Sequence, residues 1–253
     1  MRQDERAPFV EALEQARVSA YAPGEFVGQE SFMRAGEILA LAREAGIGPG
    51  VTVLDLCCGV AGPGRLITRE LGCDYLGVDY SASAVAIAAE RAAGLRCRFE
   101  VSAVPPVPIG PFDVVLLLET MLAFPDKATL VREIASALAP GGRFAFTLEE
   151  GQPLTDDERA RMPDADTVWL TPLPDLLELL RTTGLRVRWQ QECTASHLAM
   201  VDALTAAFDA HAVDIIEQVG QRAYDELLTA HRLWSTWLGT GRVRKFAMVA
   251  EKQ

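Results

Sequence analysis

The residues best suited to binding a ligand are a loop of small residues that follows an expected strand and a carboxylate further along the chain. The stretch Val51 to Leu56 is short and mostly apolar, like strands that are buried on both faces of a parallel sheet. Cys57 to Gly64 follows with three glycines, and small residues let a backbone approach a ligand closely. Asp79 ends the next expected strand, 24 residues after Asp55. An acid at about this distance (~20 residues) can hold the hydroxyls of a ribose, so the pattern predicts an adenosine-type ligand.

Candidate side chains also follow the later expected strands. Glu119 and Thr120 come directly after the fourth strand, and Glu149 and Glu150 come directly after the fifth. The carboxyl ends of parallel strands share one edge of the sheet, and ligands bind there. We therefore expect Glu119 and Thr120 to face the ligand. Glu149 or Glu150 could meet a cationic substrate, although paired acids are usually solvated.

The three histidines, His197, His211 and His231, all lie in a helical segment near the C-terminus. Histidine is the natural base near neutral pH. His197 is the best placed of them because it closely follows the sixth expected strand; the alternative for each is a surface or helix-capping role. Near the N-terminus, Tyr21 and Phe26 either form an aromatic lid or pack the first helices together.

The elements that must position these residues alternate along the chain. Apolar or alternating segments predict strands at residues 51–56, 75–78, 97–101, 112–118, 143–148, 185–191 and 243–251. Helical patterns separate most of them, at residues 65–71, 82–93, 126–138 and 171–184. The alternation predicts an α/β fold with a doubly wound, mainly parallel sheet of about seven strands.

Helices also precede and follow this sheet. Residues 5–20 and 29–45 predict two helices, and residues 196–238 predict two or three more that cover the sheet edge. We expect four parts: an N-terminal helical cap (1–46), a ligand-binding core (47–195), a helical substrate cover (196–241) and the last strand of the core sheet (242–253). Apolar residues of the cover either line a partly hydrophobic pocket or pack on the domain; they are Leu198, Met200, Val201, Leu204 and Phe208.

Composition and charge restrict the partners. The 253 residues carry a net charge of −11, which argues against nucleic acids and anionic membranes as partners. The longest wholly apolar run, Ala84 to Ala89, is too short to cross a membrane, and the charged segment Met1 to Arg6 lacks the core of a signal peptide. The five cysteines are odd in number and lack zinc-ligand spacing. We expect reduced thiols, no metal and a cytoplasmic location.

The stretch from Val53 to Arg65 resembles motif I of class I S-adenosylmethionine-dependent methyltransferases. Cys57 and Ala61 occupy positions that are usually glycine in that family. Phe112 to Val115 resembles the family's fourth strand, and Leu138 to Phe144 resembles the turn into its fifth. The chain is thus identified as similar to this family on three separate segments.

The resemblance covers roughly residues 30–150 and resumes from Trp234 to Lys252, where it is similar to the tocopherol and cyclopropane-synthase groups of small-molecule methyltransferases. It implies a Rossmann-like core, S-adenosylmethionine as cofactor, and methyl transfer to carbon, nitrogen or oxygen of a small, partly apolar metabolite. Within it, Asp79 would bind the ribose hydroxyls and Tyr80 would lie against the adenine. The positions that would contact the cofactor are Gln29, Asp55, Cys57, Gly59, Asp79, Tyr80, Ser102, Ala103, Glu119 and Thr120.

Other functions remain open at this point. A nicotinamide-dependent oxidoreductase is disfavoured because Gly59, Gly62 and Gly64 lack the glycine-x-glycine-x-x-glycine spacing. A cyclase or isomerase on the same fold would use S-adenosylmethionine only as a bound scaffold, and a binding module would have no catalytic role. The expected partner is a small-molecule acceptor, and a homodimer is compatible with the sequence. The candidates for catalysis are His197, Glu149 and Tyr21.

Overall fold

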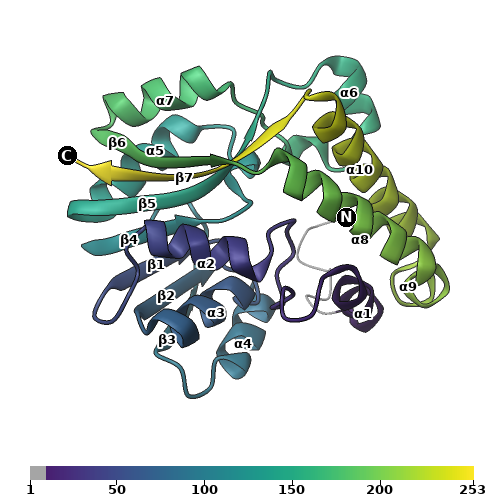
Figure 1. Cartoon of the computed structure of the whole chain (residues 1–253), viewed down its shortest axis with the longest axis horizontal. Coiled ribbons are helices and arrows are strands. Elements are labelled where there is room, and N and C mark those ends of the chain that lie inside the picture. The colour runs from purple at the N-terminus through teal and green to yellow at the C-terminus, as the bar shows by residue number, and fades with distance from the viewer. Residues whose placement is uncertain (1–9) are drawn as a thin grey trace.

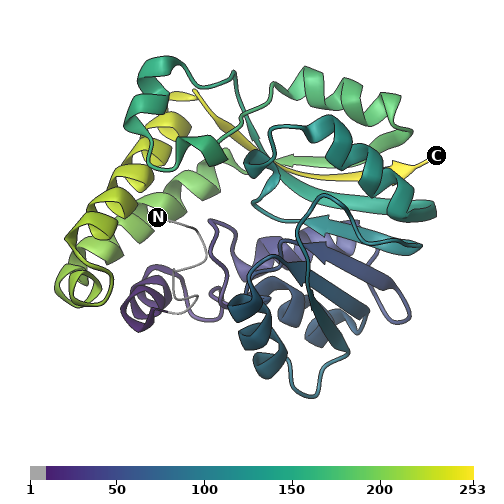
Figure 2. The ribbon, with the colours of Figure 1, turned by 180° about the vertical axis from the view of Figure 1, so that it is seen from behind.

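The computed structural model describes residues 10–253 of the chain. The charged segment 1–6 and the first part of the helix expected at residues 5–20 lie outside the described residues. Within the described part, a seven-stranded sheet carries helices on both faces and a helical layer at one end (Figures 1 and 2). The α/β fold class predicted from the sequence is confirmed. Among residues 10–253, no helix combines the length and the apolar character needed to cross a membrane.

The sheet has the strand order β3-β2-β1-β4-β5-β7-β6. Its strands are β1 (Thr52–Leu56), β2 (Asp74–Asp79), β3 (Cys97–Val101), β4 (Phe112–Leu117), β5 (Leu138–Glu150), β6 (Leu185–Glu192) and β7 (Arg244–Lys252). Neighbouring strands from β3 to β5 pair in parallel, whereas β7 runs antiparallel to both β5 and β6. The strand order reverses between β1 and β4, and ligands of such sheets bind at this switch point, outside the carboxyl ends of the strands.

Two apolar layers hold the flanking helices on the sheet. These helices are α2 (Ala35–Glu44), α3 (Gly62–Leu71), α4 (Ala82–Arg91), α5 (Lys127–Ala137) and α7 (Leu173–Thr182). Ile38 of α2 and Ile67 of α3 pack in one layer, and Leu130 of α5 and Leu176 of α7 pack in the other. Burying an aliphatic side chain of this size contributes about 1.5–3 kcal/mol. The two layers therefore fix the strand ends that carry the candidate site.

The helical layer at the end of the sheet comes from both ends of the chain. Its helices are α1 (Glu11–Ala20), α8 (Thr194–Ala210), α9 (Ala212–Val219) and α10 (Gln221–Thr240), with the short α6 (Asp156–Arg161) nearby. Figure 1 shows α8 running beside α10 and close to α1, and these pairs are in contact. Met200, Leu204 and Phe208 of α8 are buried in the cluster that joins these helices. The apolar residues of α8 thus mainly hold the cover together.

Two element boundaries expected from the sequence are wrong, each for a local reason. The helix expected at residues 29–45 begins only at Ala35, because the side-chain amide of Gln29 bonds to nearby backbone groups and holds the preceding residues as a loop. The turn expected at residues 140–142 lies inside β5. The pairing of β5 with β4 shifts register there, so the extra residues form a bulge instead of ending the strand.

Candidate active site

The loop after β1 and the carboxylate at the end of β2 meet at the carboxyl edge of the sheet. The Gly59 amide donates to Asp79 Oδ2 at 2.9 Å, and the Ser81 amide donates to Asp79 Oδ1 at 2.9 Å. The Cys58 amide donates to the Val78 carbonyl at 3.0 Å, which fixes the loop beside the strand end. An ionised carboxylate has about four acceptor positions, so Asp79 can still accept from ligand hydroxyls. The two halves of the expected nucleoside site therefore converge.

Three residues of this loop have left-handed backbone conformations. The φ angle is 59° at Cys57, 53° at Gly59 and 54° at Ala61. A side chain in this region costs roughly 1–2 kcal/mol per residue, which explains why glycine is the usual choice at such positions. Burial, helped by the charges of Asp79 and Asp55, raises the pKa of the Cys57 thiol to about 12. The thiol is therefore neutral at pH 7 and serves as a small apolar group.

Gln29 shapes a second loop, which lies against the start of α3. Its Nε2 donates to the carbonyls of Glu25 at 3.0 Å and Met33 at 2.8 Å, and its Oε1 accepts from the Val27 amide at 2.7 Å. The sequence suggested that Gln29 contacts the cofactor directly. Both of its N–H donors are instead used within residues 25–33. Gln29 consequently positions this loop rather than serving as a donor to a ligand.

Replacing Gly62 with alanine is expected to push this loop away from α3. A Cβ atom at position 62 would lie 2.6 Å from the Val27 carbonyl oxygen and 2.7 Å from the Gly28 carbonyl carbon, and neither backbone atom can move cheaply. Alanine normally favours a helix, yet we expect the free energy of unfolding to fall by about 1–3 kcal/mol. Cofactor affinity should fall as well. Urea denaturation and isothermal titration calorimetry measure the two effects.

Gly48→Ala is the matched control for this variant. A Cβ atom at position 48 meets no heavy atom within 4 Å among the described residues. We expect its free energy of unfolding to stay within about 0.5 kcal/mol of the wild-type value. Equal stability and equal cofactor affinity of the Gly62→Ala and Gly48→Ala proteins would contradict the close approach of the two loops.

Asp55 lies beneath the loop, fully buried in the sheet. Its Oδ2 accepts a hydrogen bond from the Tyr75 hydroxyl at 2.5 Å. Burial raises the pKa of Asp55 to about 7, because it outweighs the opposing hydrogen bond from Tyr75, and the charge of Asp79 adds to the rise. The sequence suggested that Asp55 lines the methionine and ribose region. In the structure, Asp55 Oδ2 instead accepts from the Tyr75 hydroxyl. Asp55 therefore supports the loop from within the sheet.

Asp55→Asn should remove part of the pH dependence of stability. The folded-state pKa of about 7 lies above the usual value of 3.8, so the stability linked to Asp55 is complete at low pH and declines as pH rises through 7. Asparagine can still accept from Tyr75 but does not ionise. From pH 5 to 7 the wild type should lose about 1 kcal/mol of stability per pH unit relative to the variant, and the difference should level off by about pH 8. Parallel stability profiles in urea from pH 5 to 8 would show that Asp55 is not perturbed.

The residues expected beside an adenine lie at the ends of β2 and β3. Tyr80 follows Asp79 and is 54% exposed, so much of its ring is accessible. The Ser102 amide donates to the Asp79 carbonyl at 2.9 Å, and the Ser102 hydroxyl donates to the Ala103 carbonyl at 3.2 Å. These bonds bring residues 102 and 103 to the same edge as Asp79. Their side chains offer one hydroxyl and one methyl group, so recognition of a base edge here would depend on the backbone.

A second group of polar residues lies at the ends of β4 and β5. Glu119 has a left-handed φ of 58°, and its amide donates to Thr147 Oγ1 at 2.6 Å. Lys245, near the start of β7, lies 2.8 Å from Glu119 Oε1 and also donates to Glu149. Glu149 and Lys245 are opposite each other in the β5–β7 pairing, which brings the two side chains together. The side chains of the three charged residues are at most 10% exposed.

The charged residues of this group fix one another's protonation. Burial would lower the pKa of Lys245, but Glu119 and Glu149 raise it to about 12. Burial would raise the pKa of Glu119, but Lys245 and His197 together bring it below its usual value. At neutral pH Lys245 is therefore an ammonium and Glu119 a carboxylate.

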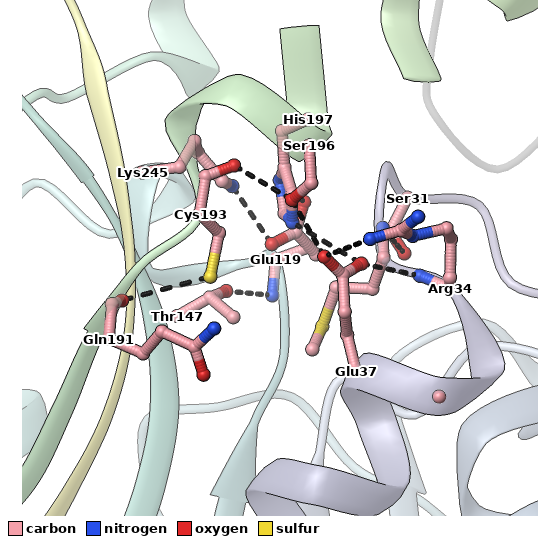
Figure 3. Close-up of polar contacts among 12 residues, drawn as sticks. Ser31, Arg34, Glu37, Glu119, Thr147, Gln191, Cys193, Ser196, His197 and Lys245 are labelled. Carbon is pink, nitrogen blue, oxygen red and sulfur yellow. Dashed lines mark hydrogen bonds and ion pairs between the residues drawn. The ribbon is translucent and has the colours of Figure 1, made fainter. Parts of the chain in front are cut away.

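His197 lies between this group and another acid (Figure 3). Its Nδ1 is 3.9 Å from Glu119 Oε2, and its Nε2 is 3.9 Å from Glu37 Oε2. Neither ring nitrogen has a hydrogen-bond partner among residues 10–253. The alternative of a surface position is wrong, because the residue is only 1% exposed. Burial lowers the pKa of His197 by more than Glu119 raises it, so the ring is neutral at pH 7.

The start of α8 is anchored on two sides, which explains the position of His197. The Cys193 amide donates to the Lys245 carbonyl at 2.7 Å. Ser196 Oγ donates to Glu37 Oε1 at 2.7 Å, as Figure 3 shows. These bonds tie the first turn of α8 to β7 on one side and to α2 on the other. The imidazole is thereby held at the sheet edge.

The last two expected site residues make local contacts near the same edge. The Tyr21 hydroxyl donates to the Ser31 carbonyl at 2.5 Å, and its ring centroid lies 5.4 Å from that of Phe26. Burial, followed by the charge of Glu119, raises the pKa of Tyr21 above its usual value, so the hydroxyl stays protonated. Thr120 Oγ1 donates at 2.7 Å to the carbonyl two residues before it and closes the turn after β4.

A cavity of about 270 Å³ opens beside these charged residues, next to the N-terminal loop, α8 and α10. Glu119, Glu149 and Lys245 belong to its charged lining. Its other walls are apolar or aromatic: Phe32, Leu122, Leu204, Ala230, His231 and Trp234. Of the apolar α8 residues that could line a pocket according to the sequence, Leu204 belongs to this lining. Trp234 packs on Trp237 and also lines the cavity.

Lys245 and Glu37 were missed by reasoning from the sequence. Lysine is almost never fully buried unless it is paired, so a lysine at the head of the apolar run Phe246 to Ala250 was an available signal. It was interpreted as part of an ordinary strand. Glu37 gave no signal, because an acid in the first turn of an amphipathic helix is common. Its role appears only when α2 and α8 are placed together.

The comparison with protein families matches residues 53–142 to a family described as "Methyltransferase domain". The matched range contains the loop after β1, Asp79 and Glu119. The segment that carries these residues is therefore similar to a methyltransferase domain, as the resemblance to class I S-adenosylmethionine-dependent methyltransferases predicted. The resemblance predicted from the sequence is therefore confirmed over residues 53–142.

Known proteins resemble the chain over different extents. Phosphoethanolamine N-methyltransferase 1 of Zea mays is 25% identical over 211 residues, which are 81% of this chain and 42% of the maize protein. The cyclopropane synthase MmaA2 of Mycobacterium tuberculosis shares the fold with a TM-score of 0.84 at 14% identity, covering 98% of this chain and 96% of that one. The [4+2]-cyclase SpnF shares it with a TM-score of 0.73 at 21% identity, covering 95% and 93%. The chain spans less than half the length of the phosphoethanolamine methyltransferases it matches.

Proposed function

We propose that this protein transfers a methyl group from S-adenosylmethionine to a small, partly apolar metabolite that binds in the cavity beside Glu119. One observation carries the proposal: the same sheet edge holds the Asp79 carboxylate bonded to Gly59 at the end of β2 and a cavity lined by charged and aromatic groups at the ends of β4 and β5. The first feature suits a nucleoside and the second suits an acceptor. The cap (residues 1–46) and the cover (196–241) would enclose both, with the core at 47–195 and the last strand at 242–253.

The residues at the edge divide into cofactor and acceptor contacts. We assign Asp79 to the ribose hydroxyls and the exposed ring of Tyr80 to the adenine. The loop residues Cys57 and Gly59 would line the methionine part of the cofactor, because the left-handed backbone at both positions allows the cofactor to approach the main chain closely. Glu119 would face the methyl-transfer space. The supporting residues Gln29, Asp55, Thr120, Ser102 and Ala103 would shape this site through the backbone.

S-adenosylmethionine supplies an electrophilic methyl group, and its departure leaves a neutral thioether that needs no proton. The protein therefore has mainly to align the acceptor and exclude water. A base is needed when the acceptor is a hydroxyl or a protonated amine. His197, neutral and unpartnered within residues 10–253, and the ionised Glu119 offer acceptors for that proton. Glu149 and the protonated Tyr21 would orient the acceptor.

The named relatives and the cysteines bear on the acceptor atom, the cellular compartment and the metabolic role. The maize relative is named for methylation of nitrogen, which favours a nitrogen acceptor for this chain. The five cysteines are free thiols, which supports a reducing cytoplasm. The maize relative is named for a small-molecule acceptor, which supports a role in small-molecule biosynthesis.

Calorimetry with four adenosine-containing cofactors tests the proposal first. We expect S-adenosylmethionine and S-adenosylhomocysteine to bind, and NAD⁺ and NADP⁺ to bind at least about a hundredfold more weakly, a difference of about 2.7 kcal/mol. Incubation with methyl-labelled S-adenosylmethionine and a panel of amines, alcohols and enols should then give labelled product and S-adenosylhomocysteine in equal amounts. Conversion of a substrate without S-adenosylhomocysteine would favour a cyclase or isomerase. Preferred binding of a nicotinamide nucleotide would refute the proposal.

A further inference from the structure

The side chains that line the cavity carry more negative than positive charge. Three carboxylates line it, those of Glu30, Glu119 and Glu149, against the two cations of Arg17 and Lys245. Arg17 lies 3.3 Å from Glu30, and Lys245 contacts both Glu119 and Glu149. Each cation of the lining is therefore already paired with a carboxylate. The lining keeps a formal charge of −1.

One buried carboxylate oxygen in this lining lacks a partner. Glu149 is 5% exposed, and its Oε1 accepts from Lys245. Its Oε2 has no hydrogen-bond partner within the described part of the chain. A buried carboxylate oxygen without a donor is unfavourable, and a donor that carries positive charge compensates it best. A ligand carboxylate or phosphate at this position would instead be repelled.

The remaining lining suits the body of an organic cation. Phe32, His231 and Trp234 contribute aromatic rings, whose faces attract cations. The rings of Phe32 and His231 meet edge to face, with centroids 5.9 Å apart. Burial lowers the pKa of His231, so this residue adds no positive charge at pH 7. The volume of about 270 Å³ restricts the ligand to a small molecule.

We propose that the acceptor site selects small organic cations, with an ammonium group received by Glu149 and an apolar body packed against Phe32 and Trp234. This inference rests on the proposed function only in taking the cavity as the acceptor site. It narrows the acceptor to amines that enter in their protonated form. It disfavours metabolites that carry a carboxylate or a phosphate into the same position.

Three probes of similar shape separate charge from apolar contact: 2-phenylethylamine, 2-phenylethanol and 3-phenylpropanoate. Their dissociation constants can be measured at pH 7 by calorimetry or ligand-observed NMR on the full chain saturated with S-adenosylhomocysteine. We expect the amine to bind at least about tenfold more tightly than the alcohol or the carboxylate. Glu149→Gln should weaken amine binding about tenfold and change alcohol binding by roughly threefold or less. In this variant Lys245 remains paired with Glu119, and thermal unfolding checks that it folds.

Glu30→Gln is the matched control. It removes the same charge from the lining, but at a side chain that is 67% exposed, so amine affinity should change by roughly threefold or less. Should Glu149→Gln fail to fold, Glu149→Asp takes its place: it keeps a carboxylate near Lys245 but shortens the side chain, so amine affinity should fall severalfold while alcohol affinity changes by roughly threefold or less. Equal binding of the three probes, tighter binding of the carboxylate, or binding of none would overturn the inference. Failure of S-adenosylhomocysteine to bind would refute the proposed function instead, and the probes would then be measured on the free protein.

Discussion

Replacing Asp79 with alanine is expected to weaken S-adenosylmethionine binding by about tenfold or more. The carboxylate accepts from the amides of Gly59 and Ser81, and in our proposal it also accepts from the ribose hydroxyls. Hydrogen bonds to charged groups contribute about 1.5–3 kcal/mol, and 1.4 kcal/mol is a tenfold change in Kd. Loss of the contact with Gly59 frees the loop after β1, which weakens binding further. Calorimetry with the folded variant measures the change.

Asp113→Ala is the matched control for this prediction. Asp113 also accepts two hydrogen bonds, from the amide and the hydroxyl of Thr52, both at 2.8 Å. It lies at the start of β4, on the edge of the sheet opposite to Asp79. We expect Asp113→Ala to lose stability and to keep the wild-type affinity for S-adenosylmethionine. Unchanged affinity of the Asp79 variant, or an equal loss in both, would contradict the assignment of the ribose.

The largest effect on stability is expected from Lys245→Met. The substitution leaves Glu119 and Glu149 buried without the ammonium that they share. Removing one partner of a buried ion pair costs about 3–5 kcal/mol, because the remaining charge is uncompensated. Urea denaturation at pH 7 should show a loss of this size. Loss of the acceptor site should follow, since both carboxylates line the cavity.

A rescue experiment separates this effect from lost packing. Adding Glu119→Gln and Glu149→Gln to Lys245→Met removes the uncompensated charges, so much of the stability should return. Lys252→Met is the control on the same strand: its Nζ donates to the Leu138 carbonyl at 2.7 Å in a less buried position, and its loss should cost about 1 kcal/mol or less. A Lys245 variant as stable as the Lys252 variant would show that the buried ion pair contributes nothing.

The sheet and the nucleoside half of the site could be predicted because their signals are local. Most of the parallel strands are short, mainly apolar runs, and β1 and β2 are adjacent in sequence and in the sheet. Asp79 could therefore be placed beside the loop at Gly59 from spacing alone. The start of α2 was predicted wrongly from the same kind of local signal. The periodicity of the residues does not reveal that the Gln29 side-chain amide holds the backbone before Ala35 as a loop.

Several residues of the acceptor half could be named as candidates, but their arrangement could not be predicted, because it depends on contacts between distant segments. Glu149 and Lys245 are 96 positions apart, and only the antiparallel register of β5 and β7 places them opposite each other. His197 comes between Glu119 and Glu37 only once α8 has packed on α2 and β7. Each of these acids, considered alone, is indistinguishable from a solvated surface residue. Their chemistry therefore became visible only in the structure.

A crystal structure of the protein bound to S-adenosylhomocysteine tests the central claim most directly. We predict that both ribose hydroxyls lie within about 3.2 Å of the Asp79 carboxylate oxygens, with the adenine on Tyr80 and the sulfur turned toward the cavity beside Glu119. A nucleoside bound at another edge of the sheet, or a ribose out of reach of Asp79, would contradict the account.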